Sequence, residues 1–327
     1  MFDDPAGQAL KTALLVAGAV LWLVWVIGLL VFRRRPELRV GTAREFFYPA
    51  AALAITLAWH FSNPSTFGFG VLALTMRAGL IIGVFLGCVW LISLWRRDSG
   101  IMDVAYPLAV AVPVVVLIAR RGAWSPHEIV MVAMLGLWSI RMSAHIGLRN
   151  RGHGEDGRYA AWRRRFGRHW WWWSLFQVFT IQGVTVWLWS LGLYMALRAG
   201  PQDLGWQHAL ALLVFAVGFG FQALGDLQLE RFKKQRRERS MVLDTGLWAL
   251  TRHPNYFGEA MVWWSFGVLA LVHPLGWAAL VCPLYVTWFM SAGSATPMQE
   301  RYLAKTKPAY ADYMQRVPAF FPWIGKQ

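Results

Sequence analysis

The chain has 327 residues and a net charge of +15; 57% of its residues are hydrophobic and 15% are charged. Soluble domains carry about 25% charged residues, and several apolar runs here exceed the roughly 18 residues that indicate a membrane-spanning helix. The composition therefore excludes an ordinary soluble domain and predicts an all-α polytopic membrane protein embedded in the lipid bilayer. Nucleic-acid binding is not expected because it needs a soluble basic face, whereas excess Lys and Arg in a membrane protein follow from the positive-inside rule.

Nine membrane helices are predicted in chain order, separated by charged or turn-forming residues: about 12–32, 46–62, 71–95, 101–119, 126–147, 174–197, 207–230, 256–272 and 275–292. This count places three large basic clusters on the same side of the membrane, at 33–39, 149–168 and 231–239. We therefore expect the N-terminus outside and the C-terminus in the cytoplasm.

The segments outside the predicted spans are short. A basic cytoplasmic loop is predicted at 149–168, and a tryptophan belt at 170–173 marks the membrane interface after it. Residues 299–327 are predicted to form a polar cytoplasmic tail. No soluble domain or internal repeat is evident.

The cysteines and the N-terminal segment exclude several other features. Cys88 and Cys282 lie in apolar runs without a nearby set of Cys or His residues, so we expect neither a disulfide nor a metal site. Asp3 and Asp4 precede the first apolar run in place of a basic segment, so a cleaved signal peptide is not expected.

The most informative stretch covers residues 221–259. Gln222 and Asp226 lie four residues apart, so they share a helix face and can offer an amide and a carboxylate to one ligand. Six cations follow at 231–239, and cations of this kind suit phosphate. Asn255 then opens a second apolar helix. These features favour a nucleotide site at the membrane surface, although Gln222 and Asp226 can equally clamp two helices together and Asn255 can simply cap its helix.

Polar side chains within predicted spans are candidates for function because a charge there costs several kcal/mol unless it is paired or hydrated. Asp103 begins one span, and Tyr106 lies one turn later on the same face; the alternative is a helix cap at the interface. Arg141 and His145, at i and i+4, can pair with Asp103 or with a bound phosphate, or reach the interface as ordinary polar residues. Glu259 can belong to a site or can neutralise an arginine.

The loop over residues 149–159 (RNRGHGEDGRY) combines glycines with three arginines, two acids and a tyrosine. Arginines beside glycines can bind phosphates while backbone amides approach closely. The alternative is a solvated loop that only sets topology. Neither a P-loop nor a dinucleotide-binding GxGxxG sequence is present, and HExxH and GxSxG are also missing from the sequence.

At this point the chain resembles a known group over about residues 75–327. It is similar to a bacterial membrane family known as a domain of unknown function, which is related to steroid 5-alpha-reductases and more distantly to isoprenylcysteine carboxyl methyltransferases. The segments that carry the resemblance are RMSAHIGLRNRGHGEDGRY (141–159), Gln222-x-x-x-Asp226, RHPNYFGE (252–259) and ERYLAKTKPAYADYMQRVP (300–318).

The resemblance implies a seven-helix reductase-like catalytic domain over 71–327, preceded by a two-helix membrane addition over 1–70. It places the protein in the bacterial inner membrane, with an NADPH cavity that faces the cytoplasm. The family's Asn/Asp pair corresponds here to Gln222 and Asp226. The family's Asn-Arg-Gly loop corresponds to residues 150–152. The residues expected to bind NADPH are Arg141, His145, Asn150, Arg151, Asp156, Arg158, Tyr159, Gln222, Asp226, Lys233, Arg237, Arg252, His253, Asn255, Tyr256 and Glu259.

The resemblance also implies a substrate site. The family uses a Glu and a Tyr to bind the 3-keto oxygen of its substrate; Asp103 lies at or near the Glu position and Trp138 near the Tyr position, and Tyr106 can supply the phenol. The expected reaction is NADPH-dependent reduction of the conjugated C=C bond of a lipophilic enone, either steroid-like or isoprenoid. Hydride reaches the β-carbon while the protein holds the carbonyl oxygen.

Two alternatives from other classes stay open. The 252–259 segment and the tail also fit an S-adenosylmethionine-dependent methyltransferase of a membrane-embedded substrate. Gln222, Asp226 and the loop around Asn150 discriminate between the two, because a methyltransferase needs no pocket for a second nucleotide half. A non-enzymatic lipid-binding or scaffold protein would bind no nucleotide, and its polar clusters would pair only with each other.

Overall fold

The structure is a computed structural model that describes residues 68–120, 124–238 and 240–323, all of them in helices, turns or extended connections without a β-strand. The predicted spans at 12–32 and 46–62 lie outside the described residues. The same holds for all but the last three residues of the predicted addition at 1–70, so this domain division stays a prediction.

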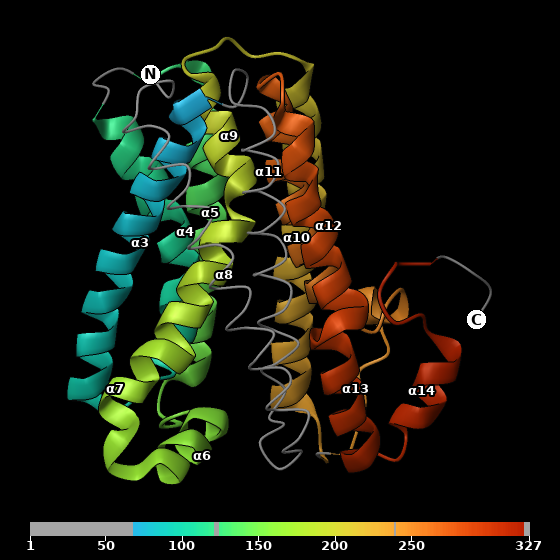
Figure 1. Cartoon of the computed structure of the whole chain (residues 1–327). Helices are drawn as coiled ribbons and strands as arrows, with labels where there is room; N and C mark the ends of the chain where they lie inside the picture. Colours follow the sequence, from blue (N-terminus) through green and yellow to red (C-terminus); the bar gives the residue numbers. More distant parts are fainter. Residues whose placement is uncertain (1–67, 121–123, 239, 324–327) are drawn as a thin grey trace, which may run out of the picture. The chain divides into compact units, whose positions relative to one another are not determined.

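The described helices follow one another in the order shown in Figure 1. Two short π-helical segments, Leu175–Thr180 and Phe289–Gly293, join α7 to α8 and α12 to α13. The α-helices are α3 (Gly68–Arg96), α4 (Ile101–Ala119), α5 (Pro126–Asn150), α6 (Gly157–Phe166), α7 (Trp170–Ser174), α8 (Ile181–Trp189), α9 (Leu191–Ala199), α10 (Trp206–Gln235), α11 (Pro254–Leu269), α12 (Val281–Trp288), α13 (Ala295–Thr306) and α14 (Tyr310–Arg316).

Length and hydropathy identify five helical stretches among the described residues that can cross a membrane, or six if the helices on either side of Ser190 count as one broken span. This confirms the prediction of an all-α polytopic membrane protein. The helix predicted at 256–272 corresponds to α11 and the 3-10 turn Ala270–Val272 that follows it. With 16 residues, α11 is shorter than the roughly 20 residues that a membrane span needs.

Local sequence signals set several helix ends. Ser125 and Glu128 form a capping box at the start of α5, in which the Glu128 amide donates to Ser125 Oγ (3.3 Å) and the Ser125 amide to Glu128 Oε2 (3.0 Å). Pro254 occupies the first turn of α11, where its missing amide proton costs nothing. Asp156 caps α6 by accepting from the Arg158 amide (2.9 Å).

Two of the segments predicted to be irregular contain helices. The loop at 149–168 includes α6, which the Asp156 cap starts and Gly167 ends with a positive φ of 50°. The tail at 299–327 includes the end of α13 and the whole of α14. There, Tyr310 and Tyr313 lie three residues apart and are both buried, so the tail packs onto the protein as an amphipathic helix.

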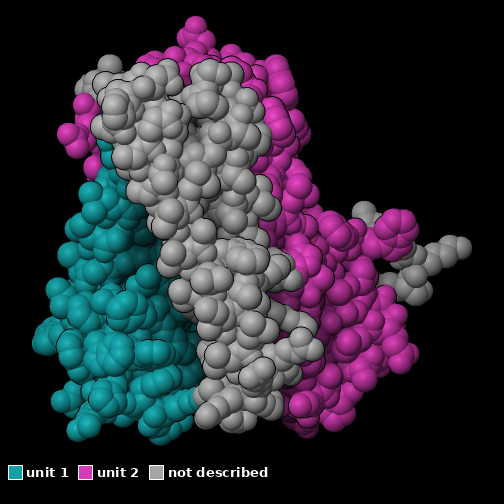
Figure 2. All heavy atoms as spheres, in the orientation of Figure 1, with its two compact units in different colours: residues 1–102, 153–188 teal, residues 103–152, 189–327 magenta. Residues whose placement is uncertain are grey.

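The chain divides into two compact units, coloured separately in Figure 2. Among the described residues, unit 1 contains those up to Met102 together with His153–Leu188, and unit 2 contains those of 103–152 and those from Trp189 onward. In unit 1, tryptophan side chains tie α3 to the later helices: Trp90 Nε1 donates to the Trp171 carbonyl (3.1 Å), and Trp187 Nε1 donates to the Thr75 carbonyl (2.7 Å).

Unit 2 is organised around α10 and α11, which pack on each other more extensively than any other pair of described elements. Glycines make this approach close. A Cβ on Gly218 would come within 2.9 Å of the Gly258 carbonyl oxygen, and one on Gly225 within 3.3 Å of the Asn255 amide nitrogen. A Cβ on Gly258 would overlap the backbone of Gln222. Small residues thus bring the polar faces of α10 and α11 together, as they do in other membrane helix pairs.

We expect Gly258→Ala to lower the free energy of unfolding by roughly 2 kcal/mol, because the added methyl group forces two backbones apart. Gly220→Ala is the matched control: it lies on α10 with open space around its Cα, and alanine favours a helix. Denaturant unfolding of the detergent-solubilised protein measures both. Equal stability of the two variants would contradict the close-approach account.

Candidate functional site

Asp226, on α10, is shared by side chains from two other helices of unit 2. Its Oδ2 atom lies 2.5 Å from Arg141 Nη2 on α5 and 3.5 Å from His145 Nε2, one turn further along α5. Its Oδ1 atom accepts a hydrogen bond from Asn255 Nδ2 on α11 (3.1 Å). His145 Nδ1 also lies 3.3 Å from Glu230 Oε1 on α10. One carboxylate therefore joins α5, α10 and α11.

Glu259 is the centre of a second cluster, one turn deeper along α11. Its carboxylate accepts from Trp138 Nε1 (3.0 Å) and Trp263 Nε1 (2.9 Å). The Gln222 side-chain amide donates to the same carboxylate. Glu259, Gln222 and both tryptophans are buried, so this acid is held by neutral N–H donors, which compensate in part for its removal from water.

The two clusters meet at α10, because the backbone carbonyl of Gln222 accepts a weak hydrogen bond from Arg141 Nη2 (3.3 Å). Two buried atoms at this junction, Arg141 Nη1 and Gln222 Oε1, have no hydrogen-bond partner among the described residues. A buried polar atom left unpaired costs about 1–3 kcal/mol. A donor and an acceptor are thus available to a ligand that carries complementary groups.

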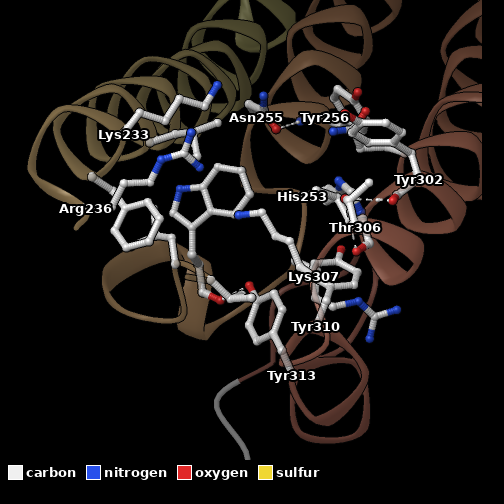
Figure 3. A pocket seen from close by; sticks show the side chains of 18 residues that line it. Lys233, Arg236, His253, Asn255, Tyr256, Tyr302, Thr306, Lys307, Tyr310 and Tyr313 are labelled. Carbon is white, nitrogen blue, oxygen red and sulfur yellow. Dashed lines mark hydrogen bonds between the residues drawn. The ribbon is translucent and has the colours of Figure 1, made fainter. Parts of the chain in front are cut away.

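A cavity of about 630 Å³ lies beside this network in unit 2 (Figure 3). Its size falls in the range of about 300–1,000 Å³ that is typical of ligand pockets. It is lined by α10, α11, α13, α14 and the connection between α10 and α11, through Leu229, Phe232, Lys233, Arg236, Val242, Leu243, Trp248, Arg252, His253, Asn255, Tyr256, Gln299, Tyr302, Leu303, Thr306, Lys307, Tyr310 and Tyr313.

The cavity is electropositive. Lys233, Arg236 and Lys307 line it, and the described lining residues include no Asp or Glu. Burial lowers the pKa of Lys307, and the neighbouring charges of Arg236 and Lys233 lower it further. The Lys307 ammonium donates to the Met241 carbonyl (2.5 Å). Cations that repel one another in this way gain free energy when an anion binds between them.

Aromatic side chains supply another part of the wall. The His253 and Tyr256 rings stack with centroids 5.2 Å apart and an interplanar angle of 8°. Burial raises the pKa of Tyr310 to about 12, and the nearby Glu300 carboxylate acts in the same direction. The Tyr310 phenol therefore remains neutral near pH 7. A flat ring system that carries phosphates matches such a lining of aromatic faces and cations.

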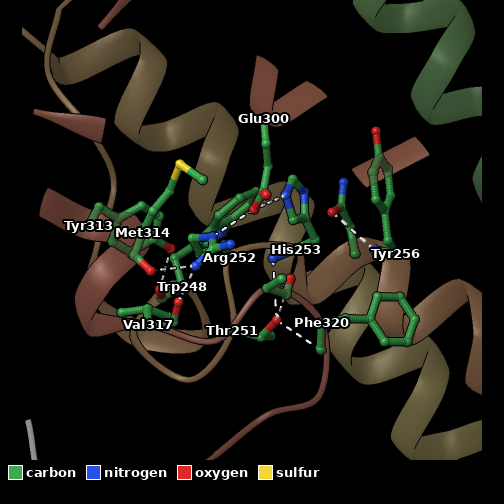
Figure 4. A network of polar contacts seen from close by, with 12 residues as sticks. Trp248, Thr251, Arg252, His253, Tyr256, Glu300, Tyr313, Met314, Val317 and Phe320 are labelled. Atoms are coloured by element: carbon green, nitrogen blue, oxygen red, sulfur yellow. Dashed lines mark hydrogen bonds and ion pairs between the residues drawn. The ribbon is translucent and has the colours of Figure 1, made fainter. Parts of the chain in front are cut away.

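The C-terminal segment is fixed to the start of α11 by Arg252 (Figure 4). Arg252 Nε donates to Glu300 Oε1 (2.6 Å), and Arg252 Nη1 donates to the carbonyls of Val317 (2.5 Å) and Met314 (2.8 Å). His253 Nε2 also lies 3.4 Å from Glu300 Oε1. Arg252 and His253 border the cavity, but these contacts show that both also hold the tail that closes its side.

The structure brings together many of the residues predicted from the sequence. Seven of them form the two connected clusters: Trp138, Arg141, His145, Gln222, Asp226, Asn255 and Glu259. Lys233, Arg252, His253 and Tyr256 join Asn255 in lining the cavity. Asp103 and Tyr106 lie in the first turns of α4, and the Tyr106 phenol is within electrostatic reach of Asp103, Glu259 and Asp226.

Other predicted residues lie elsewhere. Arg237 is exposed and is not among the residues that line the cavity. Asn150 and Arg151 lie at the C-terminal end of α5. Three more residues belong to unit 1 and have partners there: Asp156 caps α6, Arg158 Nε lies 2.9 Å from Asp156 Oδ1, and the Tyr159 hydroxyl accepts from Gln182 Nε2 (3.1 Å). Their role in cofactor binding stays a prediction.

Sequence reasoning missed the contribution of the tail to the cavity. The cavity residues that were not predicted include Tyr302, Thr306, Lys307, Tyr310 and Tyr313, whereas Arg236 belongs to the predicted cation cluster at 231–239. A signal was present: Tyr302 and Thr306 lie four residues apart, and Tyr310 and Tyr313 lie three apart, the spacing of residues on a helix face. The first pair lies on α13 and the second on α14. A segment that is polar overall can still present such a face to a pocket.

A family profile with the description "Protein of unknown function (DUF1295)" matches residues 89–317, more than two thirds of the chain. The chain belongs to this family. The matched residues include both polar clusters and all of the described cavity lining.

Comparison with curated proteins confirms the predicted relationships. The chain is 27% identical over 276 residues to an uncharacterized protein of Schizosaccharomyces pombe. The aligned region covers 75% of this chain and 78% of the yeast protein. It is 30% identical over 115 residues to steroid 5-alpha-reductase DET2 of Arabidopsis thaliana (35% of this chain, 42% of the plant protein). It is 32% identical over 95 residues to protein-S-isoprenylcysteine O-methyltransferase of Saccharomyces cerevisiae (28% of this chain, 37% of the yeast enzyme). The chain thus spans less than half the length of each of the two named enzymes.

We expect Arg252→Met to destabilise the protein by about 3 kcal/mol, because removing one partner of a largely buried ion pair leaves the other uncompensated. Limited proteolysis should then cut the tail after α13 faster. Arg316→Gln is the control, since its contacts with Asp244 and Asp312 are exposed. Unchanged protease resistance in Arg252→Met would show that Arg252 does not hold the tail.

Proposed function

We propose that this protein is an NADPH-dependent oxidoreductase that reduces the conjugated C=C bond of a lipophilic enone, steroid-like or isoprenoid. The observation that carries this proposal is the cavity of unit 2. Lys233, Arg236 and Lys307 line it together with the paired Arg252 and several aromatic rings, and its described lining includes no acid. Asn255 connects the cavity to the Asp226 cluster. The distant similarity to a protein named steroid 5-alpha-reductase supports the reaction class.

The residues of the cavity fit a dinucleotide. Lys233, Arg236 and Lys307 would bind its phosphate groups, since ammonium and guanidinium groups are the usual phosphate ligands. A third phosphate on the ribose would favour NADPH over NADH in so cationic a pocket. At the junction of the clusters, Arg141 Nη1 and Gln222 Oε1 offer a buried donor and acceptor, which suit a carboxamide. Asn255, held by Asp226, would connect the two regions.

When bound, reduced nicotinamide supplies the hydride that an enone accepts at its β-carbon. The protein's task would be to stabilise negative charge as it develops on the carbonyl oxygen. We assign this to Asp103, as a protonated carboxyl group, and to the Tyr106 phenol. The Trp138 indole N–H is bonded to Glu259, so Trp138 would shape the site rather than donate to substrate.

The same proposal sets the orientation in the membrane. Cations gather at the cytoplasmic ends of membrane helices, so the end of unit 2 that carries the cavity would face the cytoplasm and its NADPH, with the C-terminus on that side. A bacterial inner membrane would fit this arrangement. The substrate would enter from lipid.

We expect NADPH to raise the thermal stability of the purified protein, because a ligand that binds only the folded state stabilises it by about 2.7 kcal/mol at a hundredfold excess over Kd. NADH and S-adenosylmethionine should give smaller shifts. Asp226→Ala should abolish the NADPH shift, and Asp312→Ala, an exposed acid on α14, should not. A shift with S-adenosylmethionine alone would reassign the protein to methyl transfer.

We expect Asp103→Ala to lower turnover of an enone by roughly a hundredfold, the usual cost of removing one donor to a developing oxyanion, while its NADPH affinity stays unchanged. Tyr106→Phe should have a similar effect if the phenol donates. Single-turnover oxidation of bound NADPH measures the step, with the exposed Asp203→Ala as control. Full activity in both α4 variants would remove Asp103 and Tyr106 from the mechanism without affecting the cofactor assignment.

A further inference from the structure

One end of unit 1 forms a fixed corner made of the end of α3, the turn after it, α6 and α7 (Figure 1). Trp170 Nε1 donates to Ser99 Oγ in the turn (3.2 Å). Trp90 Nε1 donates to the Trp171 carbonyl (3.1 Å), and thus connects the last turns of α3 to α7. These bonds connect segments that are about 70 to 80 residues apart in the sequence.

Glu155 holds the corner together. It accepts from the Ser99 amide (2.8 Å) and from Nε and Nη2 of Arg163 (2.8 Å each). Burial by itself raises the pKa of Glu155, but the hydrogen bonds from Arg163 and Ser99 outweigh this effect, and the pKa lies below its usual value. Glu155 therefore stays ionised and paired with Arg163, which is not available to an outside partner.

The helix α6 has two different faces. Tyr159, Trp162 and Phe166, at helical spacing, turn toward the protein, where Phe166 stacks on Trp170 with ring centroids 6.1 Å apart. The arginines that follow Arg163 lie on the outer side: Arg164, Arg165 and Arg168 are exposed and make no ion pair among the described residues. A short amphipathic helix of this kind typically lies in the plane of the membrane interface.

The end of α3 brings further exposed residues to this corner, because the turn that follows it is bonded to Arg163 of α6 and Trp170 of α7 through Ser99. Arg96 and Arg97 are exposed and, within the described part of the chain, also without an acidic partner. Trp95 is 83% exposed and Trp171 is 58% exposed. We name the surface formed by Trp95, Arg96, Arg97, Arg164, Arg165, Arg168 and Trp171 the arginine corner.

We propose that the arginine corner binds the headgroups of anionic phospholipids. Guanidinium groups form paired hydrogen bonds to phosphate, and exposed tryptophans prefer the depth of the headgroups. Clusters of four to eight basic residues beside a membrane helix are sufficient to attract acidic lipid, and this corner has five. It belongs to unit 1, so it does not depend on the cavity of unit 2 or on the function proposed for it.

A purely topogenic role would require only positive charge at this end of the helices. The structure has more than this, because Glu155 neutralises Arg163 and the bonds through Ser99 fix the backbone on which the other five arginines stand. A surface that is held in place in this way can select a lipid, in addition to setting the orientation of the chain.

The test is native mass spectrometry of the full chain in uncharged detergent, titrated with phosphatidylglycerol or with phosphatidylcholine. We expect preferential retention of phosphatidylglycerol, and at least about a tenfold weaker apparent affinity in the variant R164Q/R165Q/R168Q, since each basic residue near an acidic surface contributes appreciably. The charge-preserving variant R164K/R165K/R168K should keep most of the binding. Soluble glycerol phosphate at the same concentration should not compete.

The matched control is R231Q/R301Q/K305Q, which removes the same charge from exposed positions of unit 2 that do not line the cavity. It should leave the lipid preference unchanged. Equal retention of the two lipids, or equal loss in the two glutamine variants, would overturn the proposal, because net charge alone would then explain binding. If R164Q/R165Q/R168Q is less stable in detergent, the single variant Arg168→Gln should still weaken phosphatidylglycerol retention measurably. Unchanged retention in Arg168→Gln would also overturn the proposal.

Discussion

The arrangement of unit 2 depends on one largely buried ion pair, Arg141 with Asp226, at 2.5 Å. An unpaired charge within membrane-embedded helices is costly, so each of these residues needs the other. The pair fixes the register of α5 against α10, and the second oxygen of Asp226 then orients Asn255 at the start of α11. Because Asn255 also lines the cavity, the same interaction that holds three helices together also positions a polar group at the edge of the pocket.

The contact of Asp226 with Asn255 requires α10 and α11 to approach closely, and glycine permits that approach. With side chains at 218, 225 and 258, the two backbones would have to separate, and Gln222 could no longer reach Glu259. Hydrogen bonds from two indoles and an amide then hold the Glu259 carboxylate in an apolar surrounding. Helix packing and hydrogen bonding are therefore coupled, since the close packing at the glycines brings the donors within reach of the two carboxylates.

The sequence predicted most of this because its strongest signals are local. Long apolar runs located the spans, and the i, i+4 spacing of Gln222 and Asp226 identified a polar helix face. The spacing did not reveal that Asp226 would pair with Arg141, since the contact joins residues 85 positions apart. The tail was interpreted as polar because its average composition hides the face formed by Tyr302, Tyr310 and Tyr313. Its position against the cavity depends on the contacts of Arg252 with Glu300 and the carbonyls near Val317, which no local pattern encodes.

The electrostatics of the cavity bear on the choice between the two enzyme classes to which the chain is related. S-adenosylmethionine carries a sulfonium cation and a net positive charge, whereas a dinucleotide carries several negative phosphates. Lys233, Arg236 and Lys307 line the cavity, and no acidic residue is among its described lining. Charges of one sign in a partly buried site repel a cation and attract an anion, and the low dielectric there strengthens both effects. Burial and repulsion from Arg236 and Lys233 lower the pKa of Lys307. An anionic ligand beside Lys307 would stabilise its charged form, and a cationic ligand would destabilise it. The charge of the pocket therefore favours a phosphate-bearing cofactor on grounds that are independent of the sequence similarity.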